Sequence, residues 1–318
     1  MKDIIEQIKN ANTVAITAHI DEDADALGSC LALAEVMRTQ GKTVTHFLDR
    51  PVDRRLKFLE KDCIVFDKAK DYGEFDLLIC LDTGDEKRLG ERISLFDRAR
   101  VIANIDHHYT NTNYADYNWV DGDMSSTGEM IYDFLLMMGA KISKSVAEYL
   151  YCSIMGDTGG LKYSSATPKT VMTVAKLMEE GIDHAELSRR LFDTETAPAL
   201  RLKGHIMNEI ESYFDGKVSV VSLDDADFEK YGAKEDEVGD IVNIPRVVEG
   251  TQIAVSLRKK GNDVKISLRS NGVYNVGEIA VALGGGGHKM AAGIAIDNCE
   301  ITLAKEKVLQ VIGEVING

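Results

Sequence analysis

Short apolar runs, of which the one at 100–105 is rich in β-branched residues, alternate with helical segments along the first third of the chain. The runs at 13–18, 42–48, 76–81 and 100–105 each have the length and composition of a buried strand. Between the first two runs lies 26–37, a mostly apolar segment with the length of a helix. Strands that alternate with helices predict a parallel sheet with helices on both of its faces. We therefore expect an α/β fold whose N-terminal domain contains a doubly wound, mainly parallel sheet.

The alternation of strands and helices ends after this sheet, and the sequence that follows predicts a linker and a second domain. The sequence is helical from Ser125, where a Ser- and Thr-rich stretch has the form of a helix cap, to about Leu191. It then becomes polar and carries Pro198, which favours a linker. New strands follow at 218–223, 252–258 and 264–269. The expected parts are a first domain at 1–191, a helical linker at 192–214, and a smaller α+β domain with a mixed sheet at 215–318.

Acidic and imidazole side chains follow the strands of the first predicted sheet. In an open α/β sheet the carboxyl ends of the strands form the edge at which ligands bind. Two adjacent imidazoles, His107 and His108, follow the fourth run, and they are poor core residues because each ring nitrogen needs a polar partner. The simplest alternative is a pair of histidines on a surface loop. The other candidates, at strand ends or in a glycine-containing segment further along, are His19, Asp23, Asp25, Asp82, Asp106 and Asp157.

This set of side chains predicts a metal centre. Several carboxylates in one crevice repel one another strongly unless a cation lies between them. Carboxylates with imidazoles suit Mn²⁺, Co²⁺ or Mg²⁺ better than a structural zinc site, which favours thiolates. About six ligands suggest two ions, which would lie about 3.5–4 Å apart, activate a bridging hydroxide and stabilise phosphoryl oxygens. Each acid also has a local alternative: Asp23 or Asp25 as a helix cap, and Asp82 and Asp157 as turn residues.

Charge and cysteine content exclude some classes of function. The net charge of −15 argues against electrostatic binding of long nucleic acid or of an anionic membrane, although a short phosphorylated ligand can still bind locally. The five cysteines are scattered, without metal-site or redox spacing, so we expect reduced core residues in a cytoplasmic protein. No apolar run is long enough to span a bilayer, and the N-terminus has the pattern of an amphipathic helix rather than a signal peptide.

Four spaced motifs in the first domain and one in the second carry a family resemblance. They are His19-x-x-x-Asp23-x-Asp25, Asp82, Asp106-His107-His108, Gly156-Asp157-Thr158-Gly159, and the run from Gly284 to Gly293 preceded by Arg269-Ser270. This set resembles the DHH family of phosphoesterases with its DHH-associated C-terminal domain, over nearly the whole chain. Within the family it most resembles the NrnA type, stand-alone proteins that degrade very short RNA oligomers and dephosphorylate pAp, an adenosine bisphosphate.

One loop departs from the pattern of the family. The family commonly has Asn-Pro-Asp-Gly-Asp where this chain has Asp21-Glu22-Asp23-Ala24-Asp25. The loss of the proline and the glycine changes the stiffness of the loop, because proline fixes one backbone angle and glycine permits unusual ones. Both candidate ligands, Asp23 and Asp25, are kept, so the metal centre is still expected.

The resemblance implies roles for individual residues. Two divalent ions are expected, most plausibly Mn²⁺, with Mg²⁺ or Co²⁺ as alternatives. Their ligands would be His19, Asp23, Asp25, Asp82, His107 and Asp157, with Asp82 shared between the ions. The catalytic residues would be His108, which faces the scissile phosphate, and Asp106, which orients a neighbouring histidine. The substrate-binding residues would be Arg269, Ser270, Gly284, Gly285, Gly286, Gly287 and His288.

The second domain has chemistry that suits a phosphate or carboxylate. Backbone N–H groups of a glycine run can approach an anion that side chains would block. Arg269 offers a bidentate fork for phosphate, and His288 at the end of the run could bind the same group. A flexible link is the alternative interpretation of the glycines. We expect the substrate to lie between the domains, with one domain cutting it and the other holding it, which favours short substrates.

The expected function is hydrolysis of short oligoribonucleotides to mononucleotides and of pAp to AMP, by a hydroxide that two metal ions activate. Three alternatives stay open: hydrolysis of cyclic di-AMP or its linear dinucleotide at the same site, a pyrophosphatase or polyphosphatase, and a catalytically silent nucleotide sensor. The expected partners are short RNA and small nucleotides, with neither long nucleic acid nor membrane. The sequence leaves the oligomeric state open, with a homodimer among the options.

Overall fold

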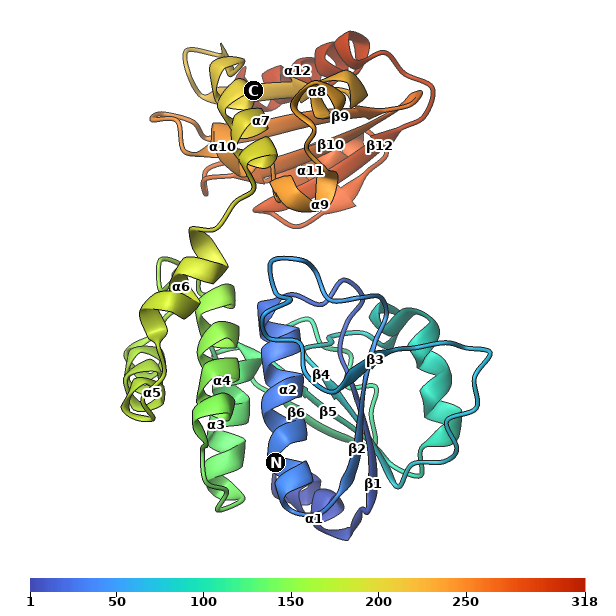
Figure 1. Ribbon diagram of the computed structural model, residues 1–318. Coiled ribbons are helices and arrows are strands. Elements are labelled where there is room, and N and C mark those ends of the chain that lie inside the picture. The colour runs from blue at the N-terminus through green and yellow to red at the C-terminus, as the bar shows by residue number, and fades with distance from the viewer. Residues whose placement is uncertain (318) are drawn as a thin grey trace. The chain divides into compact units, whose positions relative to one another are not determined.

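The computed structural model describes residues 1–317, which form two compact units (Figure 1). The first unit is Met1–Thr194, and the second begins at Glu195. Each unit contains its own six-stranded sheet and its own apolar core.

The sheet of the first unit is entirely parallel, with the strand order β3-β2-β1-β4-β5-β6. This confirms the predicted α/β fold, and β1, β2, β4 and β5 are the four strands expected from the sequence. The edge strands β3 and β6 were not expected, because three or four partly exposed residues give no clear periodicity. The strands are β1 (Thr13–Thr17), β2 (Thr43–Leu48), β3 (Cys63–Val65), β4 (Leu77–Leu81), β5 (Ile102–Asp106) and β6 (Tyr117–Val120).

Alternate side chains of the central strands enter two different cores, because successive residues of a strand point to opposite faces. Val14 and Ile16 of β1 join the core that contains buried side chains of α1 to α4, whereas Ala15 packs with residues of η1 on the other face. None of the helices within residues 1–317 combines the length and apolar character needed to cross a bilayer. The helices of this unit are α1 (Lys2–Asn10), α2 (Ala24–Thr39), the 3-10 segment η1 (Glu86–Arg98), α3 (Thr127–Met137), α4 (Lys144–Asp157), α5 (Pro168–Glu179) and α6 (His184–Phe192).

The strand order determines where a ligand can bind. The chain runs from β1 outward to β2 and β3, and then returns to β4 on the other side of β1 before it continues to β5 and β6. The connections that leave β1 and β4 therefore diverge at the carboxyl ends of these two neighbouring strands. Open α/β sheets bind ligands in the crevice at such a switch point. His19 follows β1 and Asp82 follows β4, so both lie at this crevice.

Helices α2 and α4 cross closely at small residues. A Cβ atom on Gly28 of α2 would lie 2.5 Å from the carbonyl oxygen of Tyr149 in α4. A Cβ atom on Gly156 of α4 would lie 2.7 Å from the Cβ atom of Ala24. Side chains at either glycine would push the helices apart. The crossing therefore keeps the first turn of α2 next to the last turn of α4.

The second unit has a mixed sheet, as the sequence predicts, with the order β11-β12-β10-β9-β8-β7. Within this second sheet, as far as the described residues form it, β8–β9 is the only parallel pair and the others are antiparallel. The strands are β7 (Glu211–Tyr213), β8 (Val218–Leu223), β9 (Ile253–Lys260), β10 (Asp263–Ser270), β11 (Gly286–Gly287) and β12 (Ala291–Ile296). The helices are α7 (Ala197–Asn208), α8 (Asp225–Tyr231), α9 (Glu235–Val238), α10 (Asn243–Arg246), α11 (Val276–Ala282) and α12 (Ile301–Asn317).

The segment 192–214 differs from the helical linker that the sequence predicts. Helix α7 within it is an integral part of the second unit, and β7 is an edge strand of the second sheet. The buried side chains of α7, which are Ala199, Leu202 and Ile206, join an apolar cluster with residues of β8 and α8. The boundary between the units falls between Thr194 and Glu195. A short amphipathic helix beside a proline has the same sequence pattern whether it packs into a domain or links two domains. The residues that it packs against are distant in the sequence, so the pattern does not reveal them.

Candidate metal centre

The acids and histidines singled out in the first domain all lie at the carboxyl edge of its sheet. They come from three strand ends and two helix ends: His19 after β1, Asp23 and Asp25 at the start of α2, Asp82 after β4, Asp106, His107 and His108 at the end of β5, and Asp157 at the end of α4. Three overlapping groups among them have ligand atoms within 4.8 Å of one another: His19–Asp23–Asp82, Asp25–His107–Asp157 and Asp82–His107–His108.

Asp82 lies at the centre of these groups. Its Oδ2 atom is 3.5 Å from His19 Nε2, and its Oδ1 atom is 3.5 Å from His107 Nε2, so the two oxygens face different histidines. The residue has a positive φ of 52°, a conformation that Asp adopts more readily than most residues. Thr127 donates its hydroxyl hydrogen to Asp82 Oδ1 over 2.9 Å. The carboxylate is therefore fixed between the two sides of the centre.

Asp23 serves as a helix cap and faces the centre at the same time. Its Oδ1 atom accepts hydrogen bonds from the backbone N–H groups of Asp25 and Ala26, over 2.9 and 3.1 Å, which caps α2. Its Oδ2 atom lies 3.9 Å from His19 Nε2. Capping therefore occupies one oxygen and leaves the other for a cation.

Asp25 is buried against the first turn of α3. The backbone N–H groups of Thr127 and Gly128 donate to its two oxygens, over 2.8 and 2.9 Å, and the Ser153 hydroxyl also donates to it. The positive end of the α3 dipole favours a negative charge at this position. Asp25 Oδ2 lies 3.8 Å from the Nε2 atom of His107, so one oxygen still faces the centre.

The rings of His19 and His107 are oriented as metal ligands usually are. His19 Nδ1 lies 2.6 Å from the carbonyl oxygen of Ile20, and His107 Nδ1 lies 3.4 Å from that of Met124. A carbonyl oxygen can only accept, so Nδ1 carries a hydrogen, and in the neutral ring the lone pair is on Nε2. In both rings Nε2 faces the carboxylates. Such an outer hydrogen bond fixes the tautomer of a histidine that binds a metal through its other nitrogen.

The carboxylates destabilise one another in the absence of a cation. Burial, followed by the charges of Asp82, Asp157 and Asp23, raises the pKa of Asp25 well above its usual value. Burial also raises the pKa of Asp157 to about 6, although His107 opposes this shift. Ionised carboxylates at this density need positive charge nearby.

The histidines and Asp82 respond to the same excess of negative charge. Burial would lower the pKa of His19, but its contacts with Asp82 and Asp23 outweigh burial and raise the pKa to about 9. Burial would likewise raise the pKa of Asp82, but His19 and His107 hold it below its usual value. A carboxylate and imidazole donor set of this kind fits divalent cations, and the Nε2 atoms of His19 and His107 and the Oδ2 atom of Asp23 face the place where they would bind.

Asp106 and His108 form a separate pair next to the carboxylates. Asp106 is fully buried; its Oδ1 atom accepts a hydrogen bond from His108 Nδ1 over 2.7 Å, and its Oδ2 atom accepts one from Asn111 Nδ2 over 2.6 Å. The hydrogen bond that His108 donates to Asp106 raises the pKa of His108, while burial opposes the shift. The Nε2 atom of His108 has no hydrogen-bond partner within residues 1–317. This atom is therefore free to contact a substrate.

Several supporting residues escaped the sequence-based prediction. The stretch that begins at Ser125 was expected only to cap a helix, and Ser126 does cap α3. The same turn also holds two candidate ligands, through the backbone of Thr127 and Gly128 and through the Thr127 hydroxyl. A Cβ atom on Gly128 would lie 1.7 Å from the Ser153 hydroxyl oxygen, so only glycine fits. Backbone donors leave no chemical signature in a sequence, but a glycine in the first turn of a helix is a weak signal.

Glu22, which stands where the family commonly has proline, is held by a buried ion pair. Arg92 of η1 is buried, and its Nη1 atom donates to Glu22 Oε1 over 2.7 Å and to the carbonyl oxygen of Phe47 over 3.1 Å. Its Nη1 atom also donates to the Thr17 hydroxyl over 3.0 Å. This ion pair ties the loop between His19 and Asp23 to the far face of the sheet. It gives the loop a restraint that the proline would otherwise supply.

The substrate-binding residues expected in the second unit lie at one end of its sheet. Arg269 of β10 pairs in register with Ala291 of β12, and Gly287 of β11 pairs with Ala292. The guanidinium group of Arg269 is engaged, because its Nη2 atom donates to Asp240 Oδ2 over 2.7 Å. Ser270 is buried and His288 is exposed.

The glycine run is part of the sheet and not a flexible link. Gly286–Gly287 form β11, which pairs with β12. A Cβ atom on Gly285 would lie 2.3 Å from the carbonyl oxygen of Gly293, and one on Gly287 would lie 2.5 Å from the Cα atom of Ala292. These glycines are needed because the turn lies directly against the neighbouring strand. Gly284, with a φ of 80°, begins the turn.

We expect Asp82→Asn to abolish the stabilisation that Mn²⁺ gives the protein, because the substitution removes the negative charge that His19 and His107 both face. A ligand at 100 times its dissociation constant stabilises the folded state by about 2.7 kcal/mol. Thermal unfolding with and without MnCl₂ measures this effect for the wild type and the variant. An equal rise in the melting temperature of both proteins would contradict the central position of Asp82.

We also expect Glu22→Gln to destabilise the first unit by about 3 kcal/mol, because the buried Arg92 would keep only the more distant and partly exposed Asp49 as a counter-charge. The apparent affinity for Mn²⁺ should fall with it. Urea unfolding and Mn²⁺ titration measure the two effects. The matched control is Asp71→Asn, which breaks an exposed ion pair with Arg98 of the same segment η1 and should change little. Equal behaviour of the two variants would show that the buried pair does not restrain the loop.

Comparisons with known proteins agree with this arrangement over both units. Residues 13–154 match the DHH family, N-terminal domain, and residues 212–318 match the DHHA1 domain. A Thermus thermophilus protein named bifunctional oligoribonuclease and PAP phosphatase NrnA is 32% identical over 95% of this chain and 89% of its own length. A Bacillus subtilis protein of the same name is 28% identical over 92% of each chain. The crystal structure of an exopolyphosphatase-related protein from Bacteroides fragilis superposes with a TM-score of 0.92 at 26% identity, over 98% of this chain and 95% of that one.

Proposed function

The chain belongs to the DHH family of phosphoesterases, and on this premise we propose that it hydrolyses short oligoribonucleotides to mononucleotides and pAp to AMP. Two of its relatives carry both activities in their names. The acidic net charge of −15 supports short substrates over long nucleic acid, because it offers no general attraction to a polyanion. Five unpaired cysteines fit a reducing compartment, so we expect the protein to act in the cytoplasm.

The position of Asp82 between two groups of ligand atoms carries this proposal. One oxygen faces His19 and the other faces His107, as expected for a carboxylate shared by two ions. The first ion would be held by His19, Asp23 and Asp82. The second would be held by Asp82 together with Asp25, His107 and Asp157. When bound, two divalent ions stabilise the charge on phosphoryl oxygens and lower the pKa of water. Carboxylate and imidazole ligands favour Mn²⁺, with Mg²⁺ or Co²⁺ as alternatives.

His108 would assist at the leaving group. In the hydrolysis, a water oxygen bonds to phosphorus, the P–O ester bond breaks, and the leaving oxygen gains a proton. Asp106 holds Nδ1 of His108 and raises the pKa of the ring, which favours a hydrogen on Nε2 as well. Nε2 can then donate to a phosphoryl oxygen or to the leaving oxygen. Asp106 acts as the positioning residue, because both of its oxygens are already engaged.

The second unit would hold the rest of the substrate. Arg269 offers a planar fork for a phosphate group, and a phosphate would compete with Asp240 for it. Backbone N–H groups near the glycine turn and the exposed ring of His288 could contact the same group. Ser270 is buried, so its expected role is to support this end of the sheet through its bond with Gly272.

An assay panel with Mn²⁺ tests the proposed function. It compares pAp, a ribodinucleotide, a long RNA, cyclic di-AMP and pyrophosphate at equal concentrations. Fast release of products from pAp and the dinucleotide, with the long RNA spared, is the expected result. A dominant signal from cyclic di-AMP or from pyrophosphate would replace the proposed substrates. Binding of Mn²⁺ and nucleotide without turnover of any substrate would indicate a sensor.

We expect His108→Ala to keep the Mn²⁺-dependent thermal stabilisation while kcat falls by about 100-fold or more, because general acid catalysis contributes factors of this size. The steady-state hydrolysis of pAp measures kcat. Asp106→Asn is the companion variant, since it keeps the shape of the side chain but weakens the orientation of His108. Turnover of His108→Ala near that of the wild type would contradict the role given to this histidine.

A further inference from the structure

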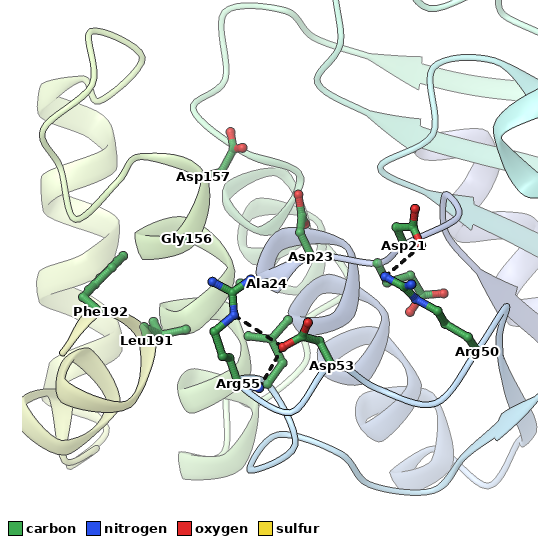
Figure 2. Close-up of a pocket in the computed structure, with 12 residues that line it drawn as sticks. Asp21, Asp23, Ala24, Arg50, Asp53, Arg55, Gly156, Asp157, Leu191 and Phe192 are labelled. Atoms are coloured by element: carbon green, nitrogen blue, oxygen red, sulfur yellow. Dashed lines mark hydrogen bonds and ion pairs between the residues drawn. The ribbon is translucent and has the colours of Figure 1, made fainter. Parts of the chain in front are cut away.

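A pocket of about 370 Å³ adjoins the candidate metal centre within the first unit (Figure 2). Asp23 and Asp157, which are both candidate ligands, line its rim. A phosphate bound at the metal centre would therefore leave the group attached to it next to this pocket. The volume is in the range of small-molecule sites. The proposed function described above gives this pocket no role of its own.

One wall of the pocket is apolar. Leu191 and Phe192, the last two residues of α6, lie together on this side, and Leu56 adds to the lining. Phe192 is 40% exposed, so a large part of its ring is open to solvent. Leu56 and Leu191 pack on the main core, which gives the wall a fixed base. An exposed aromatic ring beside a cavity is a suitable stacking surface.

The pocket lining also carries a planar cation, Arg55, which lies between Leu191 and Asp53 (Figure 2). Arg55 is held at one edge, because its Nε atom donates to Asp53 Oδ1 over 3.4 Å. The two terminal amino groups of Arg55 have no hydrogen-bond partner within residues 1–317. A guanidinium group can stack on an aromatic ligand and can donate to its polar edge.

The residues beneath the pocket are small. Ala24 begins α2 and Gly156 lies in the last turn of α4, and both line the pocket. The close crossing of the helices at this point admits no larger side chain, since a Cβ atom on Gly156 would already touch that of Ala24. The crossing of the helices that carry Asp25 and Asp157 therefore forms part of the pocket lining.

The charges around the pocket disfavour a second phosphate as its occupant. Five acidic residues contribute to the lining, against two arginines. Arg50 is paired with Asp21 over 2.8 Å, and Arg55 is partly engaged by Asp53. The lining therefore offers little unpaired positive charge to an anion. A neutral, planar group meets an aromatic ring, aliphatic side chains and a guanidinium plane.

We propose that this pocket binds the nucleobase of the nucleoside attached to the scissile phosphate, by stacking on Phe192. The proposal rests on the proposed function, because it assumes that a nucleotide phosphate occupies the metal centre. Stacking accepts every base, since each has a π-face. The pocket would thus favour nucleotides over simple phosphoesters without selecting a sequence. Arg55 would cover the base or contact its edge.

The test compares a substrate that carries a base with one that lacks it. KM and kcat are measured with Mn²⁺ for pAp and for ribose 3′,5′-bisphosphate, in the wild type, Phe192→Ala, Phe192→Trp and the control Met172→Ala. Met172 is an exposed apolar residue of α5 outside the pocket. In Phe192→Ala we expect the preference for pAp over the base-free compound, expressed as a ratio of KM values, to fall by about 10-fold. Phe192→Trp should retain the preference, and Met172→Ala should behave as the wild type.

The outcomes separate the pocket from the function on which it rests. An unchanged preference in Phe192→Ala, or an equal rise in KM for both compounds, would overturn the proposal. If the wild type hydrolyses neither compound, the proposed function fails on its own. The binding of AMP in the presence of Mn²⁺, measured by titration calorimetry, then still tests the pocket. Weaker binding in Phe192→Ala than in Met172→Ala supports it, and equal binding contradicts it.

Discussion

The repulsion among buried carboxylates at the carboxyl edge of the first sheet is the constraint on which this structure depends. Asp25 and Asp82 are almost fully buried within a short distance of the same histidine, and Asp157 also approaches its ring. Such a group is stable only where positive charge and hydrogen-bond donors surround it. The fold supplies His19 and His107 and the N-terminus of α3, and divalent ions would supply the remainder. Hydrogen bonds from the fold hold the ligand side chains in fixed positions, which is the preorganisation that metal-dependent catalysis requires.

The scaffold explains why the residues meet at this point. The chain adds strands outward from β1 on one side and then from β4 on the other, and the crevice opens between the carboxyl ends of these two parallel strands, where each delivers a ligand-bearing loop. The tight crossing of α2 and α4 at Gly28 and Gly156 brings two helix ends to the same crevice. Buried contacts behind the centre then fix the loops, such as the Glu22–Arg92 pair and the bond between Asp106 and His108. The same crossing forms part of the lining of the pocket beside Phe192. A single packing arrangement thus contributes to both the charged centre and its neighbouring pocket.

Much of the fold and the chemical residues of the centre could be predicted from the sequence, because both leave direct signals there. Strands β1, β2, β4 and β5 lie in short, mostly apolar runs, and the acids and histidines that follow them are chemically unusual at such positions. The residues that escaped prediction act through geometry. Thr127 and Gly128 bind Asp25 through backbone N–H groups, which every sequence contains. Phe192 lies in a segment that resembles a linker, and its position next to Gly160 and Leu191 depends on where α6 ends. The local alternative for Asp23, a helix cap, is also true, because its two oxygens have different partners.

The central claim is that Asp82 joins two neighbouring cation sites, and the most direct test is the electron paramagnetic resonance spectrum of the Mn²⁺-loaded protein. We predict the signal of a spin-coupled pair of Mn²⁺ ions, because ions that share a carboxylate lie about 3.5–4 Å apart. The signal should appear as the second equivalent of Mn²⁺ is added. The spectrum of isolated Mn²⁺ ions at saturation would contradict this prediction. The ion sites on the two sides of Asp82 would then not form one dinuclear centre.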